Sequence, residues 1–281
     1  MTEAGGFSQA QIALNVSQST ISTQMADLEA RLGLKLCRRG RAGFALTEDG
    51  KAVYDAAREL FSSCETFAEK VNARRGEITG ELRFAIADAL IRHPTFRIDA
   101  VIRELRHRLP AVRLNMMALD PLEIERLVLD QKLHAGIHTF PNHAPGLRYV
   151  ALFEERQTLY CGESHPLFER DGAPEISEIE QFNYAARTYY GGMLRPGAFR
   201  PERIVAHSSN MEGIVALILS GEIIGHLPDH FAEPWVTSGQ LRPIRPDDLS
   251  YNSQFECIYP VGARISRAVA VFEEIVVALA E

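Results

Sequence analysis

The chain has 281 residues, of which 46% are hydrophobic and 24% are charged, a composition typical of a folded globular protein. Its formal net charge of −7 argues against a protein that coats nucleic acid, although a local cluster of Lys and Arg can still bind DNA. The N-terminus MTEAGGFSQAQ lacks the features of a signal peptide, and no apolar run is long enough to span a bilayer, so we expect a cytoplasmic protein. Four widely spaced cysteines predict free thiols.

Two short helices are predicted near the N-terminus. Apolar residues from Ile21 to Leu32 recur at spacings of four, three and four, which predicts one face of a helix. Ser17 is its expected N-cap and Gly33 its expected C-terminal glycine. A shorter apolar segment, 10–16, precedes this helix. Two short helices joined by a tight turn predict a helix-turn-helix.

The exposed face of the second helix carries hydroxyl and amide side chains, which suit base edges in a major groove. A solvated polar face is the alternative, but the basic segment that follows favours DNA binding. In this segment Arg39 and Arg41 flank a glycine-containing turn, as in a wing that contacts phosphates. We predict DNA contacts from Ser17, Gln18, Ser19, Thr20, Ser22, Thr23, Gln24, Arg38, Arg39 and Arg41.

A long helix is predicted over residues 47–77, beginning after Thr47. Apolar residues from Val53 to Val71 alternate at spacings of four and three, which is the seam of a coiled coil. Because a narrow seam needs a partner surface, we expect a homodimer through this helix. Packing against the chain's own domain is the less favoured alternative.

From residue 81 onward, strand and helix patterns alternate, which predicts an α/β sheet with helices on both faces. About 200 residues of this kind predict two lobes, with ligands bound in the crevice beyond the strand ends. The predicted elements are Leu82–Ala87, Phe96–Leu109, Val112–Ala118, Leu122–Leu133, Leu159–Cys161, Met211–Leu219, Ile223–Leu227, Gln254–Tyr259 and Ile265–Leu279.

The stretch FSQAQIALNVSQSTISTQMADLEARLGLKLCRRGRAGFALTEDG resembles the N-terminal signature of LysR-type transcriptional regulators. It contains an S-Q-S-x-I-S recognition helix, an L-E-x-x-L-G exit and an L-T-x-x-G start of the linker helix. Four later segments, 80–84, 129–137, 165–167 and 218–228, resemble further landmarks of the family. The resemblance implies a winged helix-turn-helix with a linker helix, followed by a two-lobed, periplasmic-binding-protein-like α/β effector domain. The implied ranges are 1–46, 47–77 and 81–281, with lobe one at 81–150 and 258–281 and lobe two at 151–257.

The resemblance also implies a function. Such proteins are sequence-specific transcriptional regulators that bind promoter DNA, contact RNA polymerase and respond to a small effector between the lobes. They assemble as homodimers that usually pair into tetramers. We expect no cofactor, no catalytic residues and no metal ligands, since we find no nucleophile elbow, phosphate loop or zinc motif. The alternative is a cytoplasmic small-molecule-binding module whose DNA-binding domain is non-functional.

One departure from the family concerns the N-terminus. The family normally has a whole helix before the turn at Gly5–Phe7, and this chain begins almost at that turn. We therefore expect the first helix to be absent, and the reading frame to start further upstream. Without that helix we expect Ala10, Ile12, Leu14 and Met25 to be partly uncovered, and DNA binding to be weak.

Cleft positions taken from the resemblance nominate effector-binding residues, each with a structural alternative. Residues 208–210 open a helix, where free N–H groups attract anions, but the same residues are good helix caps. Asp88 can select an amine or a hydroxyl, or it can cap a helix. The histidines can respond to a ligand or be satisfied in the core. The nominated residues are Asp88, Asp120, His138, Thr139, Tyr189, Ser208, Ser209, Asn210 and His226.

Overall fold

The computed structural model describes residues 1–2, 4–40, 43–73, 78–170, 172–190, 199–262 and 266–280. The chain divides into two compact units, Met1–Val71 and Asn72–Glu281. Across the described ranges, no helix combines the length and the apolar character that a membrane crossing requires.

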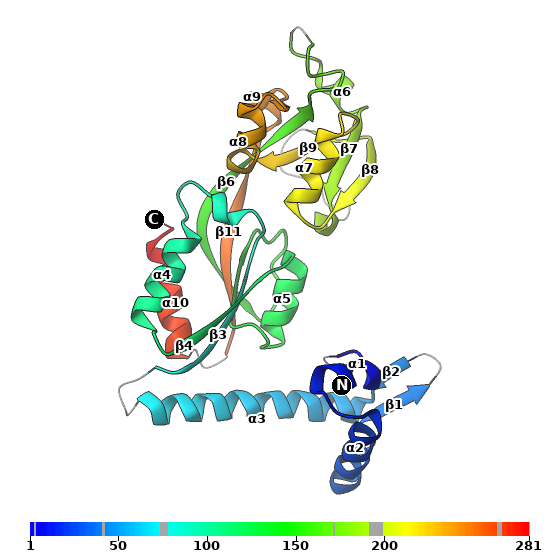
Figure 1. Cartoon of the computed structure of the whole chain (residues 1–281), viewed down its shortest axis with the longest axis vertical. Coiled ribbons are helices and arrows are strands. Elements are labelled where there is room, and N and C mark those ends of the chain that lie inside the picture. The colour runs from blue at the N-terminus through cyan, green and yellow to red at the C-terminus, as the bar shows by residue number, and fades with distance from the viewer. Residues whose placement is uncertain are drawn as a thin grey trace. The chain divides into compact units, whose positions relative to one another are not determined.

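The first unit is a small winged helix-turn-helix, as predicted (Figure 1). The Ser17 hydroxyl accepts a hydrogen bond from the Thr20 amide at 3.1 Å, and Gly33 ends the second helix at φ 68°. A core of Phe7, Ala10, Ile21 and Cys37 holds the unit together. Its elements are α1 (Phe7–Leu14), α2 (Gln18–Leu32), β1 (Cys37–Gly40), β2 (Gly43–Leu46) and α3 (Glu48–Ala73).

The apolar residues of α1 are covered unequally. Ile12 is 83% exposed and Leu14 is 60% exposed, in line with the expectation for these two residues. Ala10 is only 1% exposed, so the expectation was wrong for this residue. The reason is that Ala10 lies on the face of α1 that packs against Ile21 of α2, together with Phe7.

Two hydrogen-bonded contacts join the wing to the helices. The Glu29 carboxylate accepts from the Leu36 amide at 2.8 Å and pairs with Lys35 at 2.5 Å. Thr47 accepts from the Gly50 amide at 2.9 Å and so caps α3. Gly50 approaches the Leu36 carbonyl so closely that a Cβ would lie 1.8 Å from its oxygen. This approach explains why glycine is needed at this position.

The C-terminal part of the seam predicted on α3 is exposed in the single chain. Leu60, Phe67 and Val71 are 62%, 69% and 44% exposed. Exposed large apolar side chains along one side of a long helix favour association with another apolar surface, because association removes them from water.

The second unit is built on one mixed sheet whose strands lie in the order β4-β3-β5-β11-β6-β9-β7-β8, with β10 paired to β6. The strands β3, β4 and β5 are parallel to one another, as are β7, β8 and β9. The strand bounds are β3 (Gly80–Ile86), β4 (Val112–Ala118), β5 (Ala135–His138), β6 (Leu147–Gly162), β7 (Asn183–Arg187), β8 (Arg203–Ser208), β9 (Ile224–Pro228), β10 (Leu241–Pro243) and β11 (Tyr251–Pro260).

Helices cover both faces of this sheet and define two lobes (Figure 1). In the first lobe α4 and α10 cover one face and α5 covers the other. In the second lobe α7 and α8 pack on one face through Ile214 and Phe231. The helix bounds are η1 (Leu90–Arg92), α4 (Ile98–Arg108), α5 (Pro121–Leu129), α6 (Ile176–Ile179), η2 (Thr188–Tyr190), α7 (Met211–Leu219), α8 (Asp229–Thr237), α9 (Pro246–Leu249) and α10 (Arg267–Ala278).

The long antiparallel strands β6 and β11 run side by side from one lobe into the other. Phe153, Phe255 and Cys257 belong to the core of the first lobe, although they fall inside the range 151–257 given above for the second. The crossing therefore occurs within the strands rather than at a loop. This arrangement places residues 154–158 of β6 between the two cores.

Candidate functional site

The face of α2 predicted to contact DNA is accessible. Six of the seven predicted residues on it are exposed and Ser22 is half-buried. Part of the hydroxyl set is used locally, since Ser17 bonds to the hydroxyls of Ser19 at 2.7 Å and Thr20 at 2.8 Å. The amides of Gln18 and Gln24 lie on the exposed surface. These two side chains are therefore the best placed for base edges.

The β1–β2 hairpin forms the expected wing, with Cys37 opposite Leu46 and Arg38 opposite Ala45. Arg38 is exposed. The side chain of Arg39 and the whole of Arg41 lie outside the described residues. The phosphate contacts of all three arginines remain predictions.

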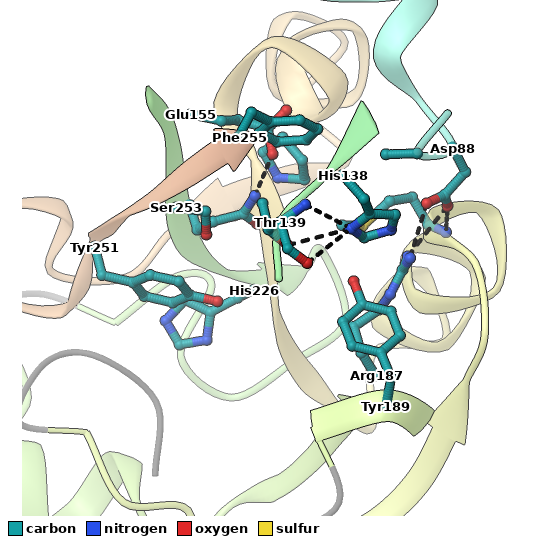
Figure 2. A pocket seen from close by; sticks show the side chains of 14 residues that line it. Asp88, His138, Thr139, Glu155, Arg187, Tyr189, His226, Tyr251, Ser253 and Phe255 are labelled. Atoms are coloured by element: carbon teal, nitrogen blue, oxygen red, sulfur yellow. Dashed lines mark hydrogen bonds and ion pairs between the residues drawn. The ribbon is translucent and has the colours of Figure 1, made fainter. Parts of the chain in front are cut away.

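A cavity lies between the two lobes (Figure 2). It opens at the carboxyl ends of parallel strands from both lobes, which is where ligands bind in open α/β sheets. The crossing strands β6 and β11 form its floor. The lining residues are Ala87, Asp88, His138, Thr139, Glu155, Gln157, Arg187, Tyr189, Met211, His226, Pro228, Tyr251, Ser253 and Phe255.

Asp88 joins the two lobes across this cavity. Its carboxylate accepts two hydrogen bonds from the Arg187 guanidinium, at 2.8 and 3.1 Å, and one from the Met211 amide at the start of α7. Burial opposes ionisation of Asp88, but the bonded Arg187 outweighs it and holds the pKa of this carboxyl below its usual value. The result is an ion pair with little exposure, 17% for Asp88 and 5% for Arg187.

For Asp88 the structure favours the capping alternative, but on a helix of the opposite lobe. Ala89 precedes η1, and the Asp88 carboxylate caps α7 by accepting from the Met211 amide. The physical reason is that β3 ends at the cavity, facing the N-terminus of α7. The anion-attracting N–H group that we predicted at this helix is therefore occupied by a carboxylate of the chain itself.

Four other nominated residues act as caps or cap neighbours and do not line the cavity. Asn210 accepts from the Gly213 amide at 2.8 Å, and the Ser208 hydroxyl donates to the Asn210 carbonyl at 2.9 Å. Asp120 accepts from the Glu123 amide at 3.0 Å. For Ser208, Ser209, Asn210 and Asp120 the structure favours the capping alternative.

The two nominated histidines of the cavity differ in how many of their ring nitrogens form hydrogen bonds. His226 bonds through Nδ1 to the Tyr184 hydroxyl and through Nε2 to the Leu249 carbonyl, both at 3.0 Å, so the structure favours a satisfied core histidine. His138 accepts from the Thr139 amide at 2.7 Å through Nδ1, which places the ring proton on Nε2. Burial and the nearby Arg187 charge lower the pKa of His138 to about 4, so the ring is neutral at pH 7.

Two buried N–H donors of the cavity have no partner. His138 Nε2 and Arg187 Nε are inaccessible to water and make no hydrogen bond within the described part of the chain. A buried donor without an acceptor costs free energy, so such groups mark a place that a ligand or water fills. Tyr189 lies beside both, with its ring edge to face against His138 at 5.5 Å and under the Arg187 guanidinium at 5.0 Å.

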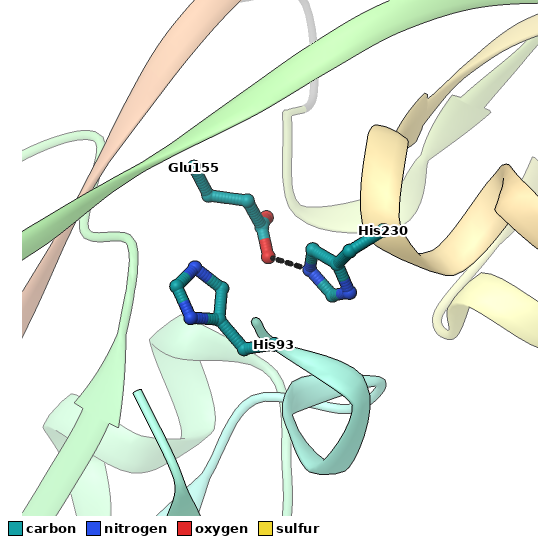
Figure 3. A group of neighbouring side chains, drawn as sticks. All are labelled: His93, Glu155 and His230. Atoms are coloured by element: carbon teal, nitrogen blue, oxygen red, sulfur yellow. Dashed lines mark hydrogen bonds and ion pairs between the residues drawn. The ribbon is translucent and has the colours of Figure 1, made fainter. Parts of the chain in front are cut away.

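Behind the cavity, Glu155 of β6 meets His93 of the first lobe and His230 of the second (Figure 3). Glu155 bonds to His230 Nε2 at 2.7 Å and to Gln157 Nε2 at 2.5 Å. One ligand atom from each of the three residues lies within 4.8 Å of the others, which raises the question of a metal ion. Burial raises the pKa of Glu155 even though His230 opposes the shift.

The tautomer of His93 argues against a metal ion at this cluster. His93 Nδ1 accepts from the Phe96 amide at 2.9 Å, so its proton lies on Nε2. Nε2 then offers an N–H, whereas a metal needs a lone pair there and a donor at Nδ1. We assign the cluster to polar contact between the lobes.

Sequence reasoning did not nominate the residues of the crossing strands, nor Arg187. Glu155, Gln157 and Ser253 lie on segments whose strand character was not predicted there, because their alternation of polar and apolar residues is weak. Arg187 ends β7, and the available signal was a polar residue at the end of the buried run 184–186.

Comparison with known proteins agrees with this architecture. A family described as LysR substrate binding domain matches residues 75–281, and one described as bacterial regulatory helix-turn-helix protein, lysR family, matches residues 1–51. The HTH-type transcriptional activator BauR of Pseudomonas aeruginosa is 38% identical over 265 residues, covering 94% of this chain and 87% of BauR.

Solved structures share the fold at low identity. LysG of Corynebacterium glutamicum, solved with the bound effector Arg, is 20% identical with a TM-score of 0.59, and the match covers 99% of this chain and 93% of LysG. CbnR in complex with its target DNA is 21% identical with a TM-score of 0.61, and the match covers 99% of this chain and 96% of CbnR.

Proposed function

The chain belongs to the LysR family of transcriptional regulators, and we propose that its effector binds in the cavity between the lobes. The observation that carries this proposal is the pair of buried, unpartnered N–H donors of His138 and Arg187 at that cavity. The family consists of regulators rather than enzymes, so no reaction is assigned to the site. The chain carries both domains of the family, the regulatory helix-turn-helix and the LysR substrate binding domain.

We further propose that α2 enters the major groove of promoter DNA and that the wing contacts phosphates. Exposed Gln18 and Gln24 on α2, and exposed Arg38 on β1, support these roles. Glutamine can form two hydrogen bonds with adenine, whereas arginine on the wing adds affinity without sequence preference.

The exposed seam of α3 supports a homodimer, since a dimer places two recognition helices on two half-sites. Pairing of dimers into a tetramer, contact with RNA polymerase and action in the cytoplasm belong to the same proposal. In this scheme the effector acts by binding one relative orientation of the lobes better than another.

The Asp88–Arg187 pair gives this switch a structural basis. The pair links the lobes directly at the cavity. A molecule that binds beside it therefore changes the free energy of the lobe arrangement in which the pair is formed. The cluster of His93, Glu155 and His230 adds a second cross-lobe contact behind the cavity.

The test measures how binding of the full chain to the DNA that flanks its own gene depends on salt, with fluorescence anisotropy of labelled DNA as the signal. We expect one discrete site, with an affinity that falls steeply as salt increases. The matched control is unrelated DNA of the same length. A chain that dimerises and binds small molecules but shows no preference between the two DNAs would support the alternative, a sensor module with a non-functional DNA-binding domain.

A further inference from the structure

We infer that the effector is a short amino carboxylate, whose carboxylate accepts hydrogen bonds from His138 and Arg187 and whose ammonium group faces Glu155. This inference rests on the proposed function, because it names the chemistry of the molecule bound in the same cavity. It is argued from the donors, the charges and the lining of the cavity.

The first step asks whether the unpartnered polar atoms of the cavity are donors or acceptors. Both unpartnered atoms, His138 Nε2 and Arg187 Nε, are donors, and both residues are at least 95% buried. The other guanidinium nitrogens of Arg187 already bond to Asp88. A ligand that satisfies both remaining donors must therefore present acceptor atoms. A carboxylate does so with its two oxygens.

The second step is the charge of that acceptor. Asp88 and Arg187 cancel one another, and His138 is neutral, so the donors carry no net excess of positive charge for a ligand. Asp88 lies at the same place and repels further negative charge. A monoanion is therefore favoured over a phosphate dianion.

The third step is the opposite wall. Glu155 is 6% exposed, lines the cavity and is fixed there by Gln157 and His230. Its two oxygens offer about four acceptor directions, and these two partners use one on each oxygen. A positively charged donor from the ligand would fill a remaining direction and would compensate the buried charge. An ammonium group has this chemistry.

The fourth step is the lining of the cavity. Aromatic rings of Tyr189, Tyr251 and Phe255 line it between the polar groups. Such walls suit a short hydrocarbon link between the two charged ends.

The test is calorimetric titration of the full chain with glycine, 3-aminopropanoate, 4-aminobutanoate and 5-aminopentanoate. Each acid is paired with its primary amide, which lacks the carboxylate, and with the acid of equal chain length that lacks the amine. We expect at least one amino carboxylate to bind, and both of its analogues to bind about 10- to 100-fold more weakly, as for a lost hydrogen bond to a charged group. Equal binding of either analogue, tighter binding of inorganic phosphate, or no binding by any member of the series would overturn the inference.

A matched set of variants tests the donor at His138. The side-chain oxygen of Asn can replace Nδ1 as the acceptor for the Thr139 amide, but Asn has no N–H at the position of His138 Nε2. The longer Gln can place an amide N–H near that position. We expect His138→Asn to weaken binding about 10- to 100-fold and His138→Gln to recover part of the loss. His107→Asn, on the exposed face of α4, is the control and should bind as the parent chain does. Equal affinity of the Asn and Gln variants would contradict the assigned donor.

Glu155→Gln tests the other end. It keeps the shape of the side chain and removes its charge, so we expect the preference for the amino carboxylate over the plain acid to fall about 10-fold or more, while the preference over the amide stays. An unchanged ratio would remove Glu155 from the inference. DNA binding measured on the same samples separates the two failures. Specific DNA binding without ligand binding contradicts only the inference, and ligand binding without DNA binding contradicts only the proposed function.

Discussion

The ion pair between Asp88 and Arg187 gives the most direct energetic prediction. Asp88→Asn leaves a guanidinium that is 5% exposed without its counter-charge, while the Met211 amide keeps an acceptor. Breaking one side of a buried pair typically costs about 3–5 kcal/mol, because the remaining charge stays desolvated. The two charge-assisted hydrogen bonds, at 2.8 and 3.1 Å, are each worth about 1.5–3 kcal/mol, which agrees with this range. We expect a loss of about 3–5 kcal/mol in the free energy of unfolding.

Urea denaturation measures this loss conveniently, because the chain has a single tryptophan. Trp235 lies in α8 of the second lobe, with its ring 5.4 Å from that of Phe231, and its fluorescence reports unfolding of that lobe. The double-mutant cycle combines Asp88→Asn with Arg187→Met. We expect the double variant to be more stable than the sum of the single effects predicts, since removing both charges leaves neither unpaired.

The matched control is Asp99→Asn, which removes the carboxylate of an exposed pair with Arg97 in the first lobe. We expect no measurable change from this substitution, because exposed pairs are screened by water. If Asp88→Asn were as mild as the control, or if the two single effects simply added, the pair would not stabilise the contact between the lobes.

Four further predictions concern other parts of the chain. Arg38→Ala should weaken binding to all DNA sequences and reduce the slope of log affinity against log salt by about one, whereas Gln18→Ala should alter sequence preference, as a panel of DNA sites would show. Gly50→Ala should lower the free energy of unfolding of the DNA-binding unit by about 1–3 kcal/mol or more, because the alanine Cβ would lie 1.8 Å from the Leu36 carbonyl oxygen. Thermal unfolding monitored by circular dichroism measures this loss. Phe67→Glu should convert a dimer into a monomer in light scattering, since that ring is 69% exposed on the seam, and an unchanged mass would exclude the seam as the interface. Burial lowers the pKa of His138 from 6.5 to about 4. The stability that neutral His138 contributes is therefore complete above pH 6.5 and is lost as the pH falls toward 4. His138→Asn should reduce the slope of unfolding free energy against pH in this window by up to about 1.4 kcal/mol per pH unit, measured by urea denaturation.

Features that depend on near neighbours were predictable from the sequence. Ser17 and Gly33 bound α2 as predicted, because a helix cap depends only on residues three or four positions away. Asp120 caps α5 for the same reason. The alternation of strands and helices also predicted the α/β sheet, since each strand carries its own apolar pattern.

Features that depend on distant residues were not predictable. Asp88 and Arg187 are 99 positions apart, and nothing near either residue indicates the other. The strand β6 extends from Leu147 to Gly162, yet only 159–161 were predicted as strand. Its middle crosses between two cores, so the residues there, such as Glu155 and Gln157, face a polar cavity and break the pattern of a strand buried on one side.

The path of β6 and β11 also has a consequence for synthesis. The first lobe needs Phe255, Cys257 and the buried face of α10 to complete its core, whereas the core residues of the second lobe, from Leu159 to Leu249, form one continuous stretch of chain. On the ribosome the second lobe can therefore close as soon as that stretch has emerged, and the first lobe must wait for the last 30 residues or so. Until then β3, β4 and β5 expose apolar surface, so a nascent chain halted before α10 is expected to depend on chaperones.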